Sequence, residues 1–159
     1  MGLPDENSRM QILVFTLDAP RYALPVATVR RVIRALQITP LPKAPEIVLG
    51  VINLQGQIIP VVDIRKRFRL PERAMEIDDR IIIAQASKRP VGLVVDAVVD
   101  VHELATRDIA DAGQVLPSAE YVLGVAKVAD EMVLINDLDR FLALPEEQTL
   151  DAALSEGIR

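Results

Sequence analysis

The sequence predicts a fold made mainly of β-strands, arranged as two small closed barrels that share one aliphatic core. Short runs rich in Val, Ile and Leu recur along the chain, separated by turns that contain Gly, Pro or Asp. The same series of runs occurs twice. Half of the 159 residues are hydrophobic but only 3% are aromatic, so aliphatic side chains must build the core. Closed barrels are favoured over one open sheet because closure removes exposed strand edges.

The repeat consists of matched segments that appear in the same order in both halves. VLGV at residues 48–51 recurs at residues 122–125. Further matches join residues 12–14 with 81–83, residues 24–32 with 93–101, and residues 60–68 with 133–141. Four collinear matches predict two copies of one supersecondary unit.

The two copies define the expected organisation of the chain. A single domain covers residues 11–144, with one subdomain at about 11–79 and the other at about 80–144. Residues 1–10 are expected to be a flexible N-terminus, and residues 145–159 a C-terminal helix and tail. A unit of about 65 residues is marginal alone, so each copy should depend on the shared core.

The first copy begins with two predicted strands, at residues 11–17 (QILVFTL) and 22–24. Residues 26–34 predict a short helix, because Pro25 suits a helix start and apolar residues recur at helical spacing. Three prolines in residues 38–45 predict an extended connection.

A hairpin is expected at the centre of the first copy, in residues 48–62. Two apolar runs flank Gln55-Gly56-Gln57, where Gly56 permits a tight turn. A short helix at residues 63–68 and a loop at residues 69–79 should complete this copy.

The second copy should follow a similar course. The expected elements are a strand at 80–86, a turn at 87–90, strand structure at 90–101, a loop at 105–118, a hairpin at 121–136 and a short helix at 137–142. Pro145 then begins an amphipathic helix with Glu146 and Glu147 in its first turn. This helix has three possible places: on the second barrel, against a partner, or against a second copy of the chain.

Composition excludes several classes of protein. The net charge of −5 gives no footprint for nucleic acid or anionic membrane. The chain has no cysteine, which excludes disulfides and thiolate chemistry. No apolar run approaches the ~20 residues that span a bilayer, and the N-terminus lacks the pattern of a signal peptide. A cytoplasmic protein without membrane insertion is expected.

Residues capable of catalysis or metal binding form no convincing site. His102 is the single histidine and follows an apolar run without a fixed partner. The acidic residues in apolar contexts, Asp96, Asp100, Asp137 and Asp139, are interpreted as solvent-facing residues or turn caps. No cofactor, metal site or catalytic residue is predicted, so the chain is expected not to be an enzyme.

The densest basic run extends from Arg65 to Arg69 (RKRFR). It is interpreted as a solvated helix face, because acidic residues follow closely. An SH3-like module that uses this run to bind a ligand or nucleic acid is the alternative.

The segments ILVFTL, LPVATVRRVI, ITPLPKAP, VLGVINLQGQIIPVVDIR, VGLVVDAVVDV and YVLGV together resemble the CheW family of chemotaxis adaptors. The resemblance extends from about Ile12 to Leu142. It implies two SH3-like five-stranded β-barrel subdomains on a shared hydrophobic core. It also implies an adaptor that couples the cytoplasmic tips of chemoreceptors to a CheA-type histidine kinase through protein contacts alone.

The resemblance also implies two contact surfaces. The kinase-binding surface would include Ile38, Gly50, Asn53, Gln55 and Gly56. The receptor-binding surface, in a groove between the barrels, would include Val29 and Arg31 from the helix side, with Val95 and Val98 from the second copy. Apolar residues flanked by charges suit the docking of a helical hairpin tip. Self-association of the chain stays open.

Two of these residues depart from the pattern common in the family. Gln55 takes the place of an arginine, which predicts a weaker or redirected contact, because charge-assisted hydrogen bonds are the stronger ones. Arg31 takes the place of a glutamate, and a reversed charge can exclude a wrong partner. An adaptor of a divergent, non-chemotaxis sensory pathway is therefore a further alternative.

Overall fold

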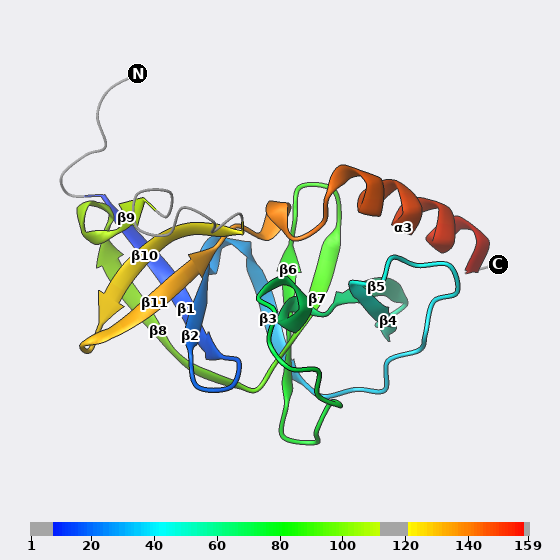
Figure 1. The fold of residues 1–159 in the computed structure, drawn as a ribbon, viewed down its shortest axis with the longest axis horizontal. Helices are drawn as coiled ribbons and strands as arrows, with labels where there is room; N and C mark the ends of the chain where they lie inside the picture. Colours follow the sequence, from blue (N-terminus) through cyan, green and yellow to red (C-terminus); the bar gives the residue numbers. More distant parts are fainter. Residues whose placement is uncertain (1–7, 112–120, 158–159) are drawn as a thin grey trace.

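The computed structural model describes residues 8–111 and 121–157, which form two β-sheets and a C-terminal helix. Figure 1 shows the two sheets side by side, with helix α3 (Leu144–Gly157) lying over the sheet nearer the C-terminus. The prediction of a mainly β fold with two small barrel subdomains on a shared core and a C-terminal helix is confirmed. One of the two sheets has six described strands where five were expected.

Sheet A contains six strands among the described residues, in the order β8-β1-β2-β11-β10-β9. Its members are β1 (Arg9–Thr16), β2 (Arg21–Pro25), β8 (Ala97–Ala105), β9 (Ala110–Asp111), β10 (Val122–Val128) and β11 (Glu131–Asn136). Its edge strands β8 and β9 follow each other in the chain through the single turn η2 (Thr106–Asp108). The short connection brings the two edges of the sheet toward each other, as in a small barrel.

Sheet B contains five strands, in the order β3-β6-β7-β5-β4. Its members are β3 (Val29–Arg34), β4 (Val48–Leu54), β5 (Gln57–Val62), β6 (Arg80–Gln85) and β7 (Pro90–Val95). Thr39, five residues after β3, forms a bridge with Val51 of β4, so this sheet also closes through the chain that follows one edge strand. The remaining elements are η1 (Val26–Thr28), α1 (Ile64–Arg67) and η3 (Leu138–Arg140).

The two sheets exchange strands between the halves of the chain. Sheet A joins the first hairpin of the first half, β1–β2, to strands of the second half, and sheet B does the reverse. Residues that correspond in the repeat make equivalent pairs in the two sheets. Leu13 pairs with Val101 in sheet A, and their counterparts Ile82 and Val32 pair in sheet B. The expected boundary between residues 79 and 80 therefore does not separate the sheets, because β3 pairs with β6 and β8 pairs with β1 across it.

Alternating side chains of the central strands enter different cores. Along β1, Ile12 and Val14 fill the interior of sheet A, whereas Leu13 and Phe15 enter a core shared by both sheets. Along β6, Ile81 and Ile83 fill the interior of sheet B, and Ile82 enters the shared core. Strands buried on both faces are apolar at every position, which explains the runs ILVF and III.

The helix predicted at residues 26–34 is wrong. This segment forms the turn η1 and then strand β3, whose pairing with β6 shifts by one residue at Arg30. A β-bulge places residues three positions apart on one face of a strand. Val29 and Val32 consequently both face the shared core. Their separation of three residues is also the spacing of apolar residues on one face of a helix.

The ends of the described chain differ slightly from expectation. β1 begins at Arg9, inside the segment expected to be a flexible N-terminus, and residues 1–7 lie outside the described residues. Most of the predicted loop at residues 105–118 also lies outside them. Helix α3 buries Leu150 and Ala153 in the shared core. Arg67 and Arg89 form ion pairs with Glu146 and Glu147 of α3. Figure 1 shows this helix lying over sheet B.

Candidate protein-docking surfaces

The first candidate surface lies along the edge strand β4, where the expected kinase-binding residues meet. Gly50 is buried and has φ of +154°, and an added Cβ would overlap the carbonyl oxygen of Thr39. Thr39 exchanges two backbone hydrogen bonds with Val51, at 2.9 and 2.8 Å. Gly50 therefore allows the closing segment to cross β4, and it offers no side chain to a partner.

The hairpin tip of this surface is a two-residue turn formed by Gln55 and Gly56. Their φ angles are +54° and +85°, which is the type I′ geometry that suits a twisted hairpin. The Asn53 side chain accepts a hydrogen bond from the Gly56 backbone N–H at 2.9 Å. Asn53 thus stabilises the turn, while the Gln55 side chain is exposed and available to a partner.

Sequence reasoning missed one residue of this surface. Leu49 occupies a bulge of β4 between the pairs Val48–Val62 and Gly50–Val61, and 40% of its surface is exposed. Half-buried Ile38 lies against Gly50, with its Cγ2 atom 2.9 Å from the ideal Cβ position. We define the β4 edge as Ile38, Leu49, Asn53 and Gln55. An exposed leucine directly before a glycine in a strand is the signal that could have identified it.

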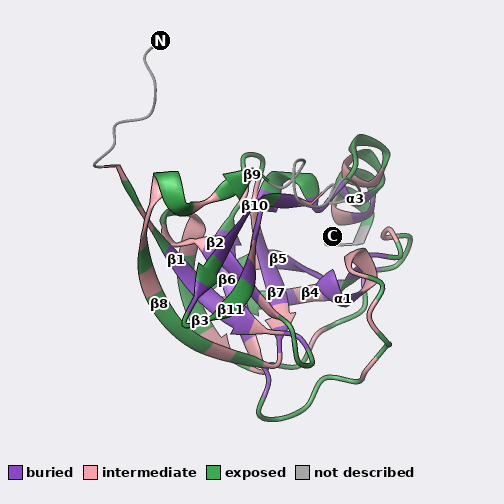
Figure 2. Ribbon diagram, turned by 60° about the vertical axis from the view of Figure 1, so that its left-hand side comes forward, coloured by how far each residue is buried: buried purple, intermediate pink, exposed green. Residues whose placement is uncertain are grey.

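The second candidate surface is formed by the edge strands β3 and β8, where Val29 and Val98 both pack against the shared core. Val32 pairs with Ile82, and Val101 pairs with Leu13, so both valines face the same core. They are 38% and 48% exposed. We define the β3/β8 face as these four valines together with Arg34 and Glu103. Much of β8 is exposed or intermediate in Figure 2.

Two residues expected on the receptor-binding surface are placed elsewhere. Val95 has no exposed surface and lies in the shared core, because β7 is covered on both faces. Arg31 is exposed but pairs with Ile83, which fills the interior of sheet B, so it faces away from Val29 and Val32. The bulge at Arg30 causes this reversal. Val32 and Val101 are the residues that sequence reasoning missed.

A cluster of ion pairs connects the two sheets. The buried Arg65 guanidinium contacts Asp96 at 2.7 Å and Asp18 at 2.9 Å, and Arg73 joins Asp96 to Asp79. Asp96 lies at the crossover from β7 to β8, and its backbone N–H donates to the Thr16 carbonyl. The cluster therefore fixes sheet A against sheet B.

The pKa values in the cluster reflect this pairing. Burial raises the pKa of Asp96, but hydrogen bonds from Arg65 and Arg73 outweigh burial and hold this pKa below its usual value. Burial likewise lowers the pKa of Arg65, and its hydrogen bonds to Asp18 and Asp96 reverse the effect. Both groups stay charged at neutral pH. The expectation that Asp96 is a solvent-facing residue or turn cap is wrong, since its partners lie far away in the sequence.

Comparisons with known proteins agree with this geometry. A family model described as the CheW-like domain matches residues 11–146. The chain belongs to this family. It is 31% identical to the chemotaxis protein CheW of Rhizobium meliloti, over 89% of this chain and 93% of that protein. It is 28% identical to the protein of the same name from Klebsiella aerogenes, over 94% and 91%.

A solved structure shares the fold. The crystal structure of the scaffolding protein TtCheW from Thermoanaerobacter tengcongensis superposes with a TM-score of 0.80 at 35% sequence identity. The match covers 87% of this chain and 96% of that chain. Apart from the first two residues of β1, the CheW-like region includes every described strand of both sheets. It ends inside α3, so Leu150 and Ala153 of the shared core lie beyond it.

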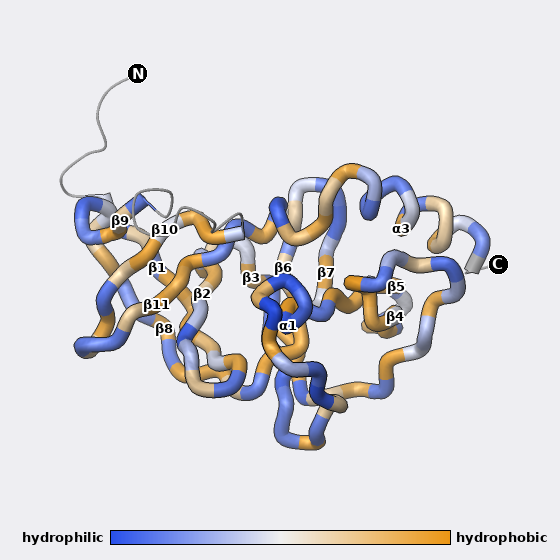
Figure 3. Tube along the Cα trace, in the orientation of Figure 1, coloured by the Kyte–Doolittle hydropathy of each residue, from blue (hydrophilic) through white to orange (hydrophobic). Residues whose placement is uncertain are grey.

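Most of the basic run of this CheW-like chain makes internal contacts and does not form the solvated face that was expected. Figure 3 shows hydrophilic residues at α1, yet Arg65 is only 7% exposed. Arg67 donates to the Phe141 carbonyl at 2.7 Å, pairs with Glu146 and lies over the Tyr121 ring. Lys66 donates to the Glu46 carbonyl. Internal contacts therefore occupy three of the four basic side chains, and the fourth, Arg69, is exposed.

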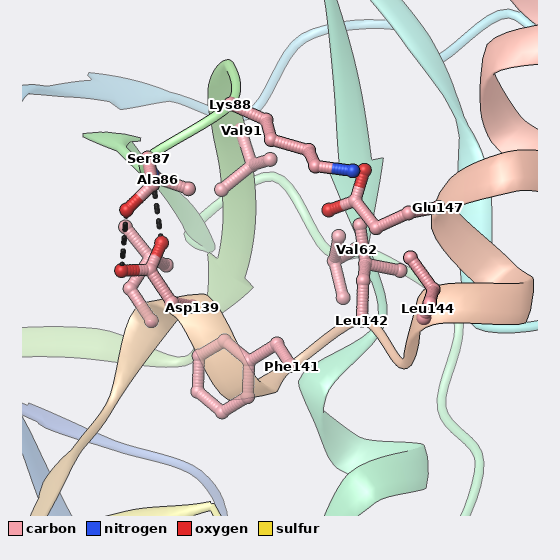
Figure 4. A pocket seen from close by; sticks show the side chains of 11 residues that line it. Val62, Ala86, Ser87, Lys88, Val91, Asp139, Phe141, Leu142, Leu144 and Glu147 are labelled. Carbon is pink, nitrogen blue, oxygen red and sulfur yellow. Dashed lines mark hydrogen bonds between the residues drawn. The ribbon is translucent and has the colours of Figure 1, made fainter.

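A hollow of about 290 Å³ lies between the β6–β7 turn, η3 and the start of α3. Figure 4 shows Ser87 and Asp139 on one side of it, and the Asp139 carboxylate accepts hydrogen bonds from the Ser87 hydroxyl and backbone N–H, each at 2.7 Å. No histidine lines the hollow. This carboxylate caps a turn, as was expected for Asp139, and Asp137 likewise caps η3.

Other chemical sites are not found in the part of the chain that the structure describes. His102 lies on β8 with its Nε2 atom 3.9 Å from the exposed Asp100 carboxylate, a weak contact. Within residues 8–111 and 121–157, no group of three or more potential metal ligands comes together. In the same residues, no helix has the length and apolar composition needed to cross a bilayer.

Proposed function

We propose that this CheW-like chain is a non-enzymatic adaptor that couples chemoreceptor tips to a CheA-type histidine kinase. The observation that carries the proposal is the presence of two separate exposed surfaces, the β4 edge and the β3/β8 face, on a fold shared with a scaffolding protein. Each surface combines exposed aliphatic side chains with polar neighbours, the composition that protein interfaces use. This function would place the chain in the cytoplasm.

We assign the kinase to the β4 edge. Leu49 and Ile38 would supply the apolar contact, and Gln55 would supply a hydrogen bond at the rim of the interface. Gly50, Gly56 and Asn53 support this surface through the backbone, so their effect on kinase binding would be indirect.

We assign the receptor tip to the β3/β8 face. Val29 and Val98 form its half-buried floor, and Val32 and Val101 its exposed contacts. Arg31 lies on the opposite face of β3 and Val95 lies inside the core, so neither belongs to the proposed contact.

Binding by the purified full chain tests both assignments. The partners are the regulatory domain of a CheA-type kinase and the cytoplasmic tip of a chemoreceptor, both encoded in the same genome. We expect Leu49→Arg to weaken kinase binding and leave receptor binding intact, and Val101→Asp to do the opposite. Met132→Arg, at a residue that is 59% exposed on β11 and on neither surface, is the control. Failure of the unaltered chain to bind either partner would refute the adaptor function.

A further inference from the structure

The β3/β8 face consists of two strips that occupy equivalent positions in the two sheets. Val29 and Val32 on β3 correspond to Val98 and Val101 on β8. Their partners correspond as well, since Val29 pairs with Ala84 and Val98 pairs with Phe15, both residues of the shared core. The approximate symmetry that relates the two halves of the repeat therefore superposes the valines of one strip on the valines of the other.

The charges on the two strips are opposite. Arg34 on β3 corresponds to Glu103 on β8, and the two residues end the strips at equivalent registers, opposite Arg80 and Gln11. The bulged residue of β3 is a further exposed arginine, Arg30, whereas its counterpart on β8 is the uncharged Val99. Exchanging the two sheets therefore places an acidic residue, Glu103, where the basic Arg34 was.

The two charged residues that end the strips have no ion-pair partner among the described residues. Arg65, Arg67 and Arg89 form ion pairs within the protein. Arg34 and Glu103, in contrast, make no ion pair or side-chain hydrogen bond with any residue that the structure describes. Unpaired opposite charges beside exposed valines match a partner with complementary charges, and such complementarity steers and orients docking.

We propose that the β3/β8 face is electrically polarised and selects the orientation of an amphipathic helical partner. The partner carries carboxylates on the side that meets β3 and Lys or Arg on the side that meets β8, with apolar residues between them. This inference rests on the proposed function, in which a receptor tip is that partner. The charges on β3 and β8, rather than the shape of the apolar surface, then determine the orientation in which the tip binds.

The near symmetry of the face means that its polarity can be reversed without a change in its apolar surface. If Arg34 and Glu103 exchange their charges, the valines keep the same arrangement and only the polarity is reversed. A partner can then bind after a half-turn that brings its acidic side to β8. Two substitutions that each weaken binding should therefore compensate for each other.

The test measures the Kd of a fluorescently labelled receptor-tip fragment from the same genome for the full chain and its variants. We expect Arg34→Glu and Glu103→Lys each to raise Kd about tenfold at low salt, and less at high salt. The variant with both substitutions should bind more tightly than either single variant. Lys127→Glu on β10 and Glu156→Lys on α3 make the same changes in net charge outside the face and should leave Kd unchanged.

The possible results separate this inference from the proposed function. If the tip does not bind the unaltered chain, the adaptor function is refuted and this inference with it. If the tip binds but the single variants do not differ from the controls, polarity is refuted and the function stands. Polarity is also refuted if the fold-increase in Kd of the double variant equals the product of the fold-increases of the two single variants. If the variants change only self-association, the face belongs to a second copy of the chain.

Discussion

Gly50 and Gly124 occupy the same position in the two sheets, and each lies beneath the segment that closes its sheet. A Cβ added to Gly50 would overlap the carbonyl oxygen of Thr39, and one added to Gly124 would overlap Ile109. The residue before each glycine, Leu49 or Leu123, occupies a β-bulge and is exposed. The repeated VLGV segment thus encodes a bulge, an exposed leucine and a crossing of the chain.

This relationship predicts different costs for two glycine substitutions. Gly50→Ala should lower the free energy of unfolding by about 2–3 kcal/mol, because the added methyl group meets rigid backbone. Gly56→Ala should cost only about 1 kcal/mol, since nothing lies within 4 Å of its ideal Cβ position and only its positive φ opposes the change. Urea denaturation of both variants measures the difference. Equal costs would contradict the proposed role of Gly50.

The ion-pair cluster predicts an effect of Asp96→Asn that depends on pH. At pH 7 the substitution should lower the free energy of unfolding by about 2 kcal/mol, less than for a fully isolated buried pair, because Asp18 still contacts Arg65. The folded state holds the pKa of Asp96 below its unfolded value. Its stabilising contribution is therefore complete at neutral pH and is lost as the pH falls below about 4.

Denaturation of Asp96→Asn and of the unaltered chain at several pH values tests this linkage. The difference between them should be constant from pH 7 to about 5 and should shrink at lower pH. Asp130→Asn, at an almost fully exposed carboxylate, is the control and should have little effect at any pH. A difference that grows as the pH falls would show that Asp96 is not held as a carboxylate.

The positions of Val95 and Val101 predict a clear division between stability and binding. Val95→Ala should cost about 1–3 kcal/mol of stability, because it leaves a cavity in the shared core. Its effect on binding of the receptor tip should be small once the protein is folded. Val101→Ser should change stability by less than about 0.5 kcal/mol and weaken binding of the tip. Thermal denaturation and a binding titration of both variants distinguish core from contact.

Helix α3 is predicted to be a structural part of the domain. Leu150→Ala should cost about 2–4 kcal/mol, because Leu150 has no exposed surface and fills the shared core. Leu144→Ala, in the first turn of the same helix, should cost little because Leu144 is 63% exposed. Circular dichroism during urea denaturation measures both. Equal stabilities would show that α3 does not stabilise the sheets.

Local sequence patterns predicted the strands and turns well. The continuous apolar run Ile81–Ile83 and the turn at Gln55-Gly56 are local features, and both predicted the correct elements. The helix predicted at residues 26–34 is wrong because the bulge at Arg30 gives the apolar residues of a strand the spacing expected in a helix. The same bulge turned Arg31 away from the expected surface. A single sequence does not show where a ladder shifts by one residue.

Long-range pairing limited the prediction of the site. Arg65 belongs to a basic run that was expected to be exposed. It is buried, and it pairs with Asp18 in the β1–β2 turn and with Asp96 at the β7–β8 crossover. Val95 reads like Val98, and only the strand order shows that β7 is central and β8 lies at an edge. The family resemblance supplied the two surfaces as expectations, and their binding roles stay predictions. The three-dimensional arrangement decided which side chains reach them.

The exchange of strands sets the order in which the molecule can be completed during synthesis. All of sheet B comes from residues 29–95, so its strands are available once that stretch has left the ribosome. The hairpin β1–β2 is made first but must wait for β8, β10 and β11 before its open edges are covered. The earliest part of the chain is thus the last to find its neighbours, and a chain that ends near residue 96 would display an apolar hairpin with both outer edges unpaired.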